Sequence, residues 1–150
     1  MQTRRQIADM IRKKGYRATP QRIIIYEALW KVGSHPTVAE VHKYATQSDP
    51  SISLATVYNT LHLFEEIGLV REMSAKEGSA RYDPNTEAHV NLICQECGKV
   101  VDYECSHLDD LLKELEGNTG FRIDVPLFEI KGLCDECRKY GSRFQLTVTE

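Results

Sequence analysis

Two pairs of cysteines constrain the fold of this chain more than any other feature. They are Cys94-x-x-Cys97 and Cys134-x-x-Cys137, with 36 residues between the pairs. A two-residue spacing lets a tight turn aim both sulfurs at one ion, and two such turns complete a tetrahedral site of four thiolates. The sequence therefore predicts a structural Zn2+ ion bound by Cys94, Cys97, Cys134 and Cys137. A redox-active dithiol is the alternative, but a second pair favours the metal.

Charge is divided unevenly along the chain of 150 residues. Residues 1–81 carry 12 basic and 8 acidic side chains, a net charge of +4, whereas residues 82–150 carry 7 and 14, a net charge of −7. A basic N-terminal half attracts phosphate groups, whereas an acidic C-terminal half repels them. A chance distribution of surface charge is the alternative explanation.

Hydropathy and cysteine content indicate the compartment. No apolar run approaches the ~18–20 residues of a membrane span, and the first residues lack the apolar core of a signal peptide. Two C-x-x-C pairs without a secretion signal indicate thiolate ligands rather than disulfides. We therefore expect a cytoplasmic protein with no membrane partner.

The N-terminal half is predicted to hold four helices. They span 3–14, 20–32, 38–48 and 54–67, and the last three follow the helix-capping residues Thr19, Thr37 and Ser53. In the fourth helix, a spacing of three and four residues predicts a core face of Leu54, Val57, Leu61 and Phe64. Two short strands, LVREM and ARYD, follow around a turn at 75–79. This order is that of a winged helix-turn-helix.

The other face of the fourth helix indicates DNA binding. Thr56, Tyr58 and Asn59 lie near its N-terminus, where Asn can bond adenine and apolar or aromatic groups can meet the thymine methyl. Arg17 and Arg22 could neutralise phosphates beside them. The alternative is that Tyr58 packs on a neighbouring helix and the charges form a solvated surface.

The C-terminal half reads as mixed helix and strand. HVNLIC and KVVDYE are predicted strands joined by the first cysteine pair. Ser106 is expected to cap a helix, with Leu108, Leu111, Leu112 and Leu115 facing inward. A strand interrupted at Pro126 follows. The fold class is therefore α+β, with a winged-helix DNA-binding domain at 1–82, a hinge at 83–88 and an α/β dimerisation and metal-binding domain at 89–150.

A second set of side chains could hold another metal. His35, Asp83, His89, Asn91 and Asp102 offer the nitrogen and oxygen donors that suit Fe2+, Mn2+ or Zn2+. His89 and Asn91 are two apart on a predicted strand, so they face the same side. Spacing alone also permits plain readings, with His35 before Pro36 as a loop residue and Asp83 before Pro84 as a turn.

These residues together resemble the ferric uptake regulator family of metal-dependent bacterial and archaeal transcription regulators. The resemblance runs from about Gly15 to Cys137. Its pieces are GYRATPQR, SHPTVAEV, SLATVYNTLHLFEEIGLV, ARYDP, HVNLICQECGKVVDY and GLCDEC. It implies a homodimer whose subunits pair strands, and it implies that the four cysteines bind zinc.

The resemblance also implies roles for individual residues. A regulatory Fe2+ or Mn2+ would lie between the two domains, bound by His35, Asp83, His89, position 91 and Asp102. Tyr58 and Asn59 fall where such proteins touch bases, and Arg17 falls where a basic residue reaches the minor groove. Asp83 and Asp102 match the peroxide-responsive branch, in which bound Fe2+ reacts with peroxide and a ligand histidine is oxidised. The histidines so used align with His35 and His89.

The chain departs from the family at position 91. The family usually has H-x-H where this chain has His89-Val90-Asn91, and an amide oxygen is a weaker, neutral ligand. Asn91 could ligate weakly, be replaced by water, or leave the task to Glu87.

The function predicted from the sequence is that of a metal-dependent transcriptional repressor, responsive to peroxide or iron, that closes on operator DNA when the ion binds. A plain iron, manganese or zinc uptake regulator is the alternative within the family. A redox enzyme, or a protein-binding zinc module without DNA contact, is the alternative outside it.

Overall fold

A computed structural model describes residues 3–33, 35–73, 80–123 and 128–140 of the chain. The chain forms two compact units, Met1–Glu87 and Ala88–Glu150. Among the described helices, none is long and apolar enough to cross a membrane. The predicted turn at 75–79 and the strand break at Pro126 lie outside the described residues.

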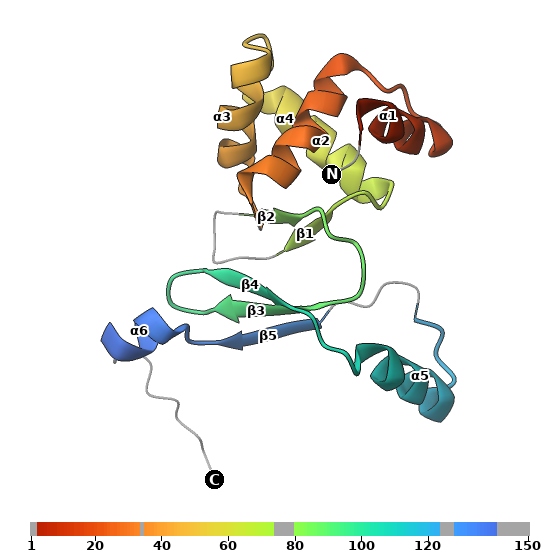
Figure 1. Ribbon diagram of the computed structural model, residues 1–150, viewed down its shortest axis with the longest axis vertical. Helices are drawn as coiled ribbons and strands as arrows, with labels where there is room; N and C mark the ends of the chain where they lie inside the picture. Colours follow the sequence, from red (N-terminus) through yellow and green to blue (C-terminus); the bar gives the residue numbers. More distant parts are fainter. Residues whose placement is uncertain (1–2, 34, 74–79, 124–127, 141–150) are drawn as a thin grey trace. The chain divides into compact units, whose positions relative to one another are not determined.

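In its described residues, unit 1 contains four helices and a two-stranded antiparallel sheet (Figure 1). The helices are α1 (Arg4–Lys13), α2 (Pro20–Val32), α3 (Val38–Ser48) and α4 (Leu54–Glu66), and the strands are β1 (Arg71–Met73) and β2 (Arg81–Asp83). Thr19, Thr37 and Ser53 each cap a helix through the side-chain oxygen, which accepts a backbone amide in the first turn. The predicted winged helix-turn-helix is confirmed in its order of elements.

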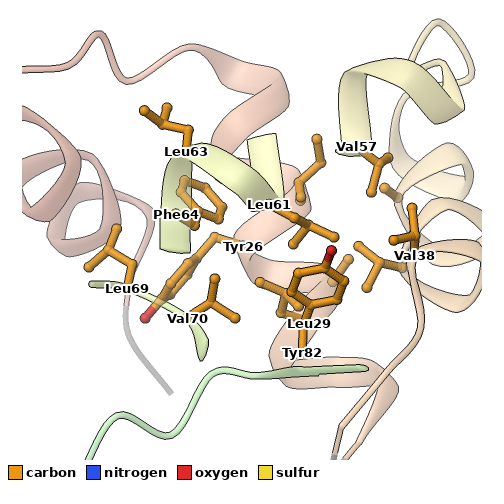
Figure 2. Close-up of a cluster of buried hydrophobic side chains, with 14 of the residues drawn as sticks. Tyr26, Leu29, Val38, Val57, Leu61, Leu63, Phe64, Leu69, Val70 and Tyr82 are labelled. Atoms are coloured by element: carbon orange, nitrogen blue, oxygen red, sulfur yellow. The ribbon is translucent and has the colours of Figure 1, made fainter. Parts of the chain in front are cut away.

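The core of unit 1 lies between its helices, with Tyr82 of β2 packed against it. Phe64 of α4 is fully buried and packs edge-on against Tyr26 of α2, with ring centroids 5.6 Å apart. Figure 2 shows these two rings among the other buried side chains of the cluster. Val57, Leu61 and Phe64 are buried as predicted, but Leu54 is 45% exposed, so its assignment to the core was wrong. Leu54 is the first residue of α4, and the buried positions of the helix begin one turn later, at Val57.

Unit 2 is built on a three-stranded sheet of order β4-β3-β5 (Figure 1). The strands are β3 (Val90–Cys94), β4 (Val100–Tyr103) and β5 (Phe128–Gly132), and the helices are α5 (Leu108–Thr119) and α6 (Asp135–Tyr140). β3 pairs antiparallel with β4 and parallel with β5. Helices and strands together form the predicted α+β class.

The leucines of α5 differ from the prediction. Leu108 is buried, but Leu111 and Leu115 are 42% and 39% exposed. Ser106 does not cap the helix, because the N-cap position falls at His107. An apolar stripe at helical spacing needs a partner surface, and in the described part of one chain Leu111 and Leu115 are left largely open to solvent.

Candidate metal centres and nucleic-acid interface

The four thiols of the two cysteine pairs converge on one point in unit 2. All four sulfurs lie within 4.8 Å of one another, and the Sγ atoms of Cys97 and Cys134 are 3.7 Å apart. Two thiolates bound tetrahedrally to one Zn2+ at about 2.3 Å would be about 3.8 Å apart. The donor set and its spacing therefore fit a four-coordinate zinc ion.

Strand pairing explains how two cysteine pairs separated by 36 residues of sequence meet. Parallel pairing places Cys94 opposite Gly132, and the Gln95 amide donates to the Gly132 carbonyl oxygen at 2.8 Å. The chain leaves β5 two residues before Cys134, whose amide donates to Cys94 Sγ at 3.3 Å. On the other side, Gly98 has a φ of +71°, which only glycine adopts at low cost, and it closes the turn that holds Cys97.

Electrostatics in this cluster favours a bound cation. Burial raises the pKa of the Cys94 thiol, but backbone amides of Cys134, Cys97 and Glu96 outweigh it and bring the pKa down to about 6. The neighbouring thiol of Cys134 raises the pKa of Cys137 far above its ordinary value. Four thiolates this close repel one another, and a divalent ion removes that repulsion.

Unit 1 holds one half of the predicted regulatory set. His35, in the loop between α2 and α3, and Asp83, at the end of β2, are 1% and 2% exposed. The Nε2 atom of His35 lies 3.9 Å from Oδ2 of Asp83. Two ligand bonds of about 2.1 Å can span up to about 4.2 Å, so this separation allows both atoms to reach one ion. The pair joins residues 48 positions apart, which local spacing could not have revealed.

Unit 2 holds the other half. His89 is 3% exposed, and its Nε2 atom lies 3.8 Å from Oδ1 of the part-exposed Asp102. Asn91 is fully buried and lies opposite Asp102 in the antiparallel pairing of β3 and β4. Neither polar atom of the Asn91 side chain has a hydrogen-bond partner among the described residues. Asn91 and Asp102 thus occupy paired positions of one sheet, and His89 directly precedes its central strand.

The predicted DNA-contact residues lie on α4 and beside it. A polar groove of about 560 Å³ brings Arg17 and Arg22 together with Thr56 and Asn59. Arg22 is oriented by a hydrogen bond from Nη1 to the carbonyl oxygen of Arg17 at 2.7 Å. Tyr58 does not line this groove. It is 53% exposed on α4, so within unit 1 it does not pack on a neighbouring helix as the alternative interpretation had it.

Thr56 and Leu54 both differ from their predicted roles. The hydroxyl of Thr56 lies 2.8 Å from that of Ser53, so part of its hydrogen-bonding capacity serves the helix N-terminus. Leu54 is exposed one helical turn before Tyr58 and adds an apolar group to the same face. The sequence signal that could have indicated its exposure was its position as the first residue of the helix.

Arg81, which contacts the loop of His35, was also not predicted from the sequence. It lies two residues before Asp83 on β2, and its Nη1 atom donates to the carbonyl oxygen of His35 at 2.9 Å. A basic residue at that spacing from a predicted ligand was the available signal, because alternate residues of a strand share a face.

A helical unit closed by a two-stranded hairpin, followed by an α/β unit with a four-thiol cluster, is the organisation expected of a winged-helix, metal-responsive transcriptional repressor. The chain belongs to the ferric uptake regulator family, whose family model matches residues 13–130. Proteins of this family are dimeric transcriptional regulators that bind operator DNA. The alternative of a redox enzyme is therefore excluded.

Relatives and solved structures agree with this assignment. The peroxide-responsive repressor PerR of Staphylococcus epidermidis is 39% identical over 132 residues, which are 88% of each chain. The ferric uptake regulator of Pseudomonas aeruginosa, solved with manganese, superposes with a TM-score of 0.75 at 25% identity, over 85% of this chain and 96% of that one. The Campylobacter jejuni peroxide stress regulator has a TM-score of 0.66 at 26% identity, over 90% and 99%.

Proposed function

We propose that this repressor binds a regulatory Fe2+ or Mn2+ ion through His35, Asp83, His89, Asn91 and Asp102, and that it responds to peroxide in its Fe2+ form. Two near-buried imidazoles, each with a carboxylate oxygen at 3.8–3.9 Å, are the observation that carries the proposal. Their mixed nitrogen and oxygen donors suit these ions better than the thiolate cluster does. The protein would act in the cytoplasm, with Zn2+ held separately by Cys94, Cys97, Cys134 and Cys137.

The ion would control DNA binding by joining the two domains, 1–82 and 89–150, across the hinge at 83–88. His35 and Asp83 belong to unit 1, whereas His89 and Asp102 belong to unit 2, so an ion bound by all four favours a closed arrangement. Moving the population from mostly open to mostly closed requires about 5 kcal/mol of differential affinity. Three or four ligand bonds can supply that free energy.

The DNA-binding surface would be the exposed face of α4 and the groove beside it. Tyr58 and Asn59 would contact bases in the major groove, with Thr56 at the edge, while Arg17 and Arg22 would contact phosphates. In a dimer, two α4 helices would enter successive major grooves about 34–36 Å apart. The net charge of +4 on residues 1–81 supports this orientation.

A homodimer would form through unit 2. Leu92, Val101 and Ile130 are paired across the three strands and are 40%, 44% and 57% exposed, so one face of the sheet is apolar and open in the single chain. The exposed leucines of α5 add to the apolar surface of unit 2. Large exposed apolar surfaces of this kind mark protein–protein contacts. A second copy of the chain would bury them.

Peroxide would act on a ligand histidine. One peroxide molecule would transfer an oxygen atom to an imidazole ring carbon and leave as water, with the bound Fe2+ supplying the reactivity. The oxidised ring is a poorer ligand, so the ion and the operator DNA would be released. The resemblance to the peroxide-responsive branch supports this role for His35 or His89.

Mass spectrometry after exposure to peroxide tests this function. We expect the protein loaded with Fe2+ to gain the mass of one oxygen atom on His35 or His89, and the protein loaded with Mn2+ to gain none. His42 and His62 serve as internal controls, because both lie outside the proposed centre. Unmodified His35 and His89 after Fe2+ and peroxide would instead favour the plain iron, manganese or zinc uptake regulator, which the weaker ligand at Asn91 also favours.

A further inference from the structure

The central strand of unit 2 carries a row of polar side chains. Asn91 on β3 lies opposite Asp102 on β4 and opposite Glu129 on β5. Residues paired across neighbouring strands project from the same face of a sheet. The next row, Val101, Leu92 and Ile130, is exposed and apolar, so it marks the opposite face. The amide of Asn91 is therefore flanked by a carboxylate on each side.

The Asn91 amide is buried with its hydrogen-bonding capacity unused. Its exposed fraction is 0%, and neither Nδ2 nor Oδ1 has a hydrogen-bond partner among the described residues. An amide needs an acceptor for its NH2 group and a donor or a cation for its oxygen. Carboxylates can accept from Nδ2 but cannot satisfy Oδ1. A cation bound at Oδ1 meets the second need, and negative charge beside it favours that cation.

We infer that Glu129 is an additional ligand of the regulatory ion and compensates for Asn91 at the position where the family usually has histidine. This inference rests on the proposed function. Glu129 is half-buried, so its side chain can rotate toward the ion, and it is one methylene longer than Asp102. It faces Asn91 from β5, whereas Asp102 approaches His89 from β4. The centre then carries one more carboxylate in place of an imidazole.

This ligand exchange also predicts metal preference. Carboxylate and amide oxygens suit Mn2+ better than they suit Zn2+, which binds imidazole and thiolate readily. The centre of this chain would therefore discriminate against Zn2+ more strongly than one with imidazole at position 91. Glu87, the other candidate for the missing ligand, precedes the sheet and is not paired with Asn91, whereas Glu129 is.

Titration of the full-length, zinc-containing protein with Mn2+ tests the role of Glu129. Glu129→Gln removes the charge and keeps the shape, and we expect it to weaken Mn2+ binding at least about tenfold. Glu114→Gln, the same change at an exposed position of α5, should leave the affinity unchanged. Zinc content and the Tm of the Mn2+-free protein show that each variant is folded. Equal Mn2+ affinity in Glu129→Gln and the unsubstituted protein would overturn the inference.

A double substitution separates direct ligation from a distant effect of charge. In an Asn91→His background, the restored imidazole should make Glu129 less important, so Glu129→Gln should then weaken Mn2+ binding by clearly less than tenfold. An equal loss in both backgrounds would overturn direct ligation.

His89→Ala separates a failure of the Glu129 role from a failure of the regulatory centre itself. If it abolishes Mn2+ binding while Glu129→Gln has no effect, the regulatory centre stands and only the role of Glu129 fails. If neither variant weakens binding, the centre itself is misplaced.

Discussion

The guanidinium group of Arg81 fixes the main chain of His35, with Nη1 donating to the His35 carbonyl oxygen at 2.9 Å. His35 has a φ of +56°, a conformation that costs a non-glycine residue about 1–2 kcal/mol. Such strain persists where the surroundings determine the backbone. The Tyr82 amide also donates to the Pro36 carbonyl oxygen at 2.9 Å, and Thr37 pairs with Arg81. The same strand, β2, thus holds the loop of His35 and carries Asp83.

Replacing Arg81 should therefore disturb the His35 half of the centre. Arg81→Ala removes a charged donor from a part-buried carbonyl, so we expect the free energy of unfolding to fall by about 1.5–3 kcal/mol. Mn2+ affinity should fall with it, because His35 is no longer held beside Asp83. Urea denaturation and Mn2+ titration measure the two effects. Arg5→Ala, on the exposed surface of α1, is the control, and a variant at Arg81 that behaves like it would disprove the anchoring role.

The strain at His35 can be measured with a matched pair of substitutions. His35→Gly and His35→Ala both remove the imidazole and should both abolish binding of the regulatory ion. Glycine adopts a positive φ without strain but loses more conformational entropy on folding, so we expect His35→Gly to be more stable than His35→Ala by about 0.5–1 kcal/mol. Chemical denaturation at equal metal content gives this difference. A more stable His35→Ala would mean that the loop does not require the positive φ.

The helices of unit 1 could be predicted because their signals are local. Thr19, Thr37 and Ser53 cap helices through contacts three residues away, which a sequence displays directly. Leu54 shows the limit of periodicity. Its spacing to Val57 is that of a core residue, but what covers a side chain depends on tertiary neighbours, and Leu54 has few at the helix start. The predicted burial of Leu111 and Leu115 was wrong for a related reason. Their spacing is that of an apolar helix face, but spacing does not reveal which surface covers that face.

The candidate sites divide in the same way. The spacing of Cys94 and Cys97 predicts a metal site, and the second cysteine pair predicts the remaining ligands without any knowledge of the fold. The approach of His35 to Asp83 depends on how a loop lies along β2, so it could be expected only by resemblance to a family. No sequence pattern pointed to Glu129, because its position opposite Asn91 follows from the parallel register of β3 and β5.

Base reading should depend on the exposed face of α4. Tyr58→Ala and Leu54→Ala remove the two large apolar side chains there, so we expect each to weaken binding to operator DNA by about 1–3 kcal/mol and binding to random DNA much less. Arg17→Ala should weaken both kinds of DNA alike and reduce the salt dependence. Competition binding with operator and random duplexes at several salt concentrations tests this. Equal losses on both duplexes for Tyr58→Ala would argue against base contact.

Dimerisation should depend on the apolar face of the unit 2 sheet. Ile130→Lys places a charge in the row formed with Leu92 and Val101, so we expect a shift from dimer to monomer in analytical ultracentrifugation. The fold should survive, because Ile130 is 57% exposed in the single chain. Phe121→Lys is the control, since Phe121 is 75% exposed but outside the strands. A fully dimeric Ile130→Lys protein would place the interface elsewhere.

The cluster of four thiols should be required for the structure of unit 2 rather than for sensing. Cys97→Ser removes one thiolate, leaving a three-thiol site that binds Zn2+ far more weakly. Because an ion bound by the four thiols would connect the turn after β3 to α6, we expect loss of bound zinc, loss of the dimer and a fall in Tm. Cys105→Ser, at a cysteine outside the cluster, should change none of these properties. Zinc content by atomic emission, together with ultracentrifugation, provides the measurement. A Cys97→Ser protein that is zinc-free yet still a stable dimer would show that the four thiols do not hold the unit together, and the cluster would then need a redox or sensing role instead.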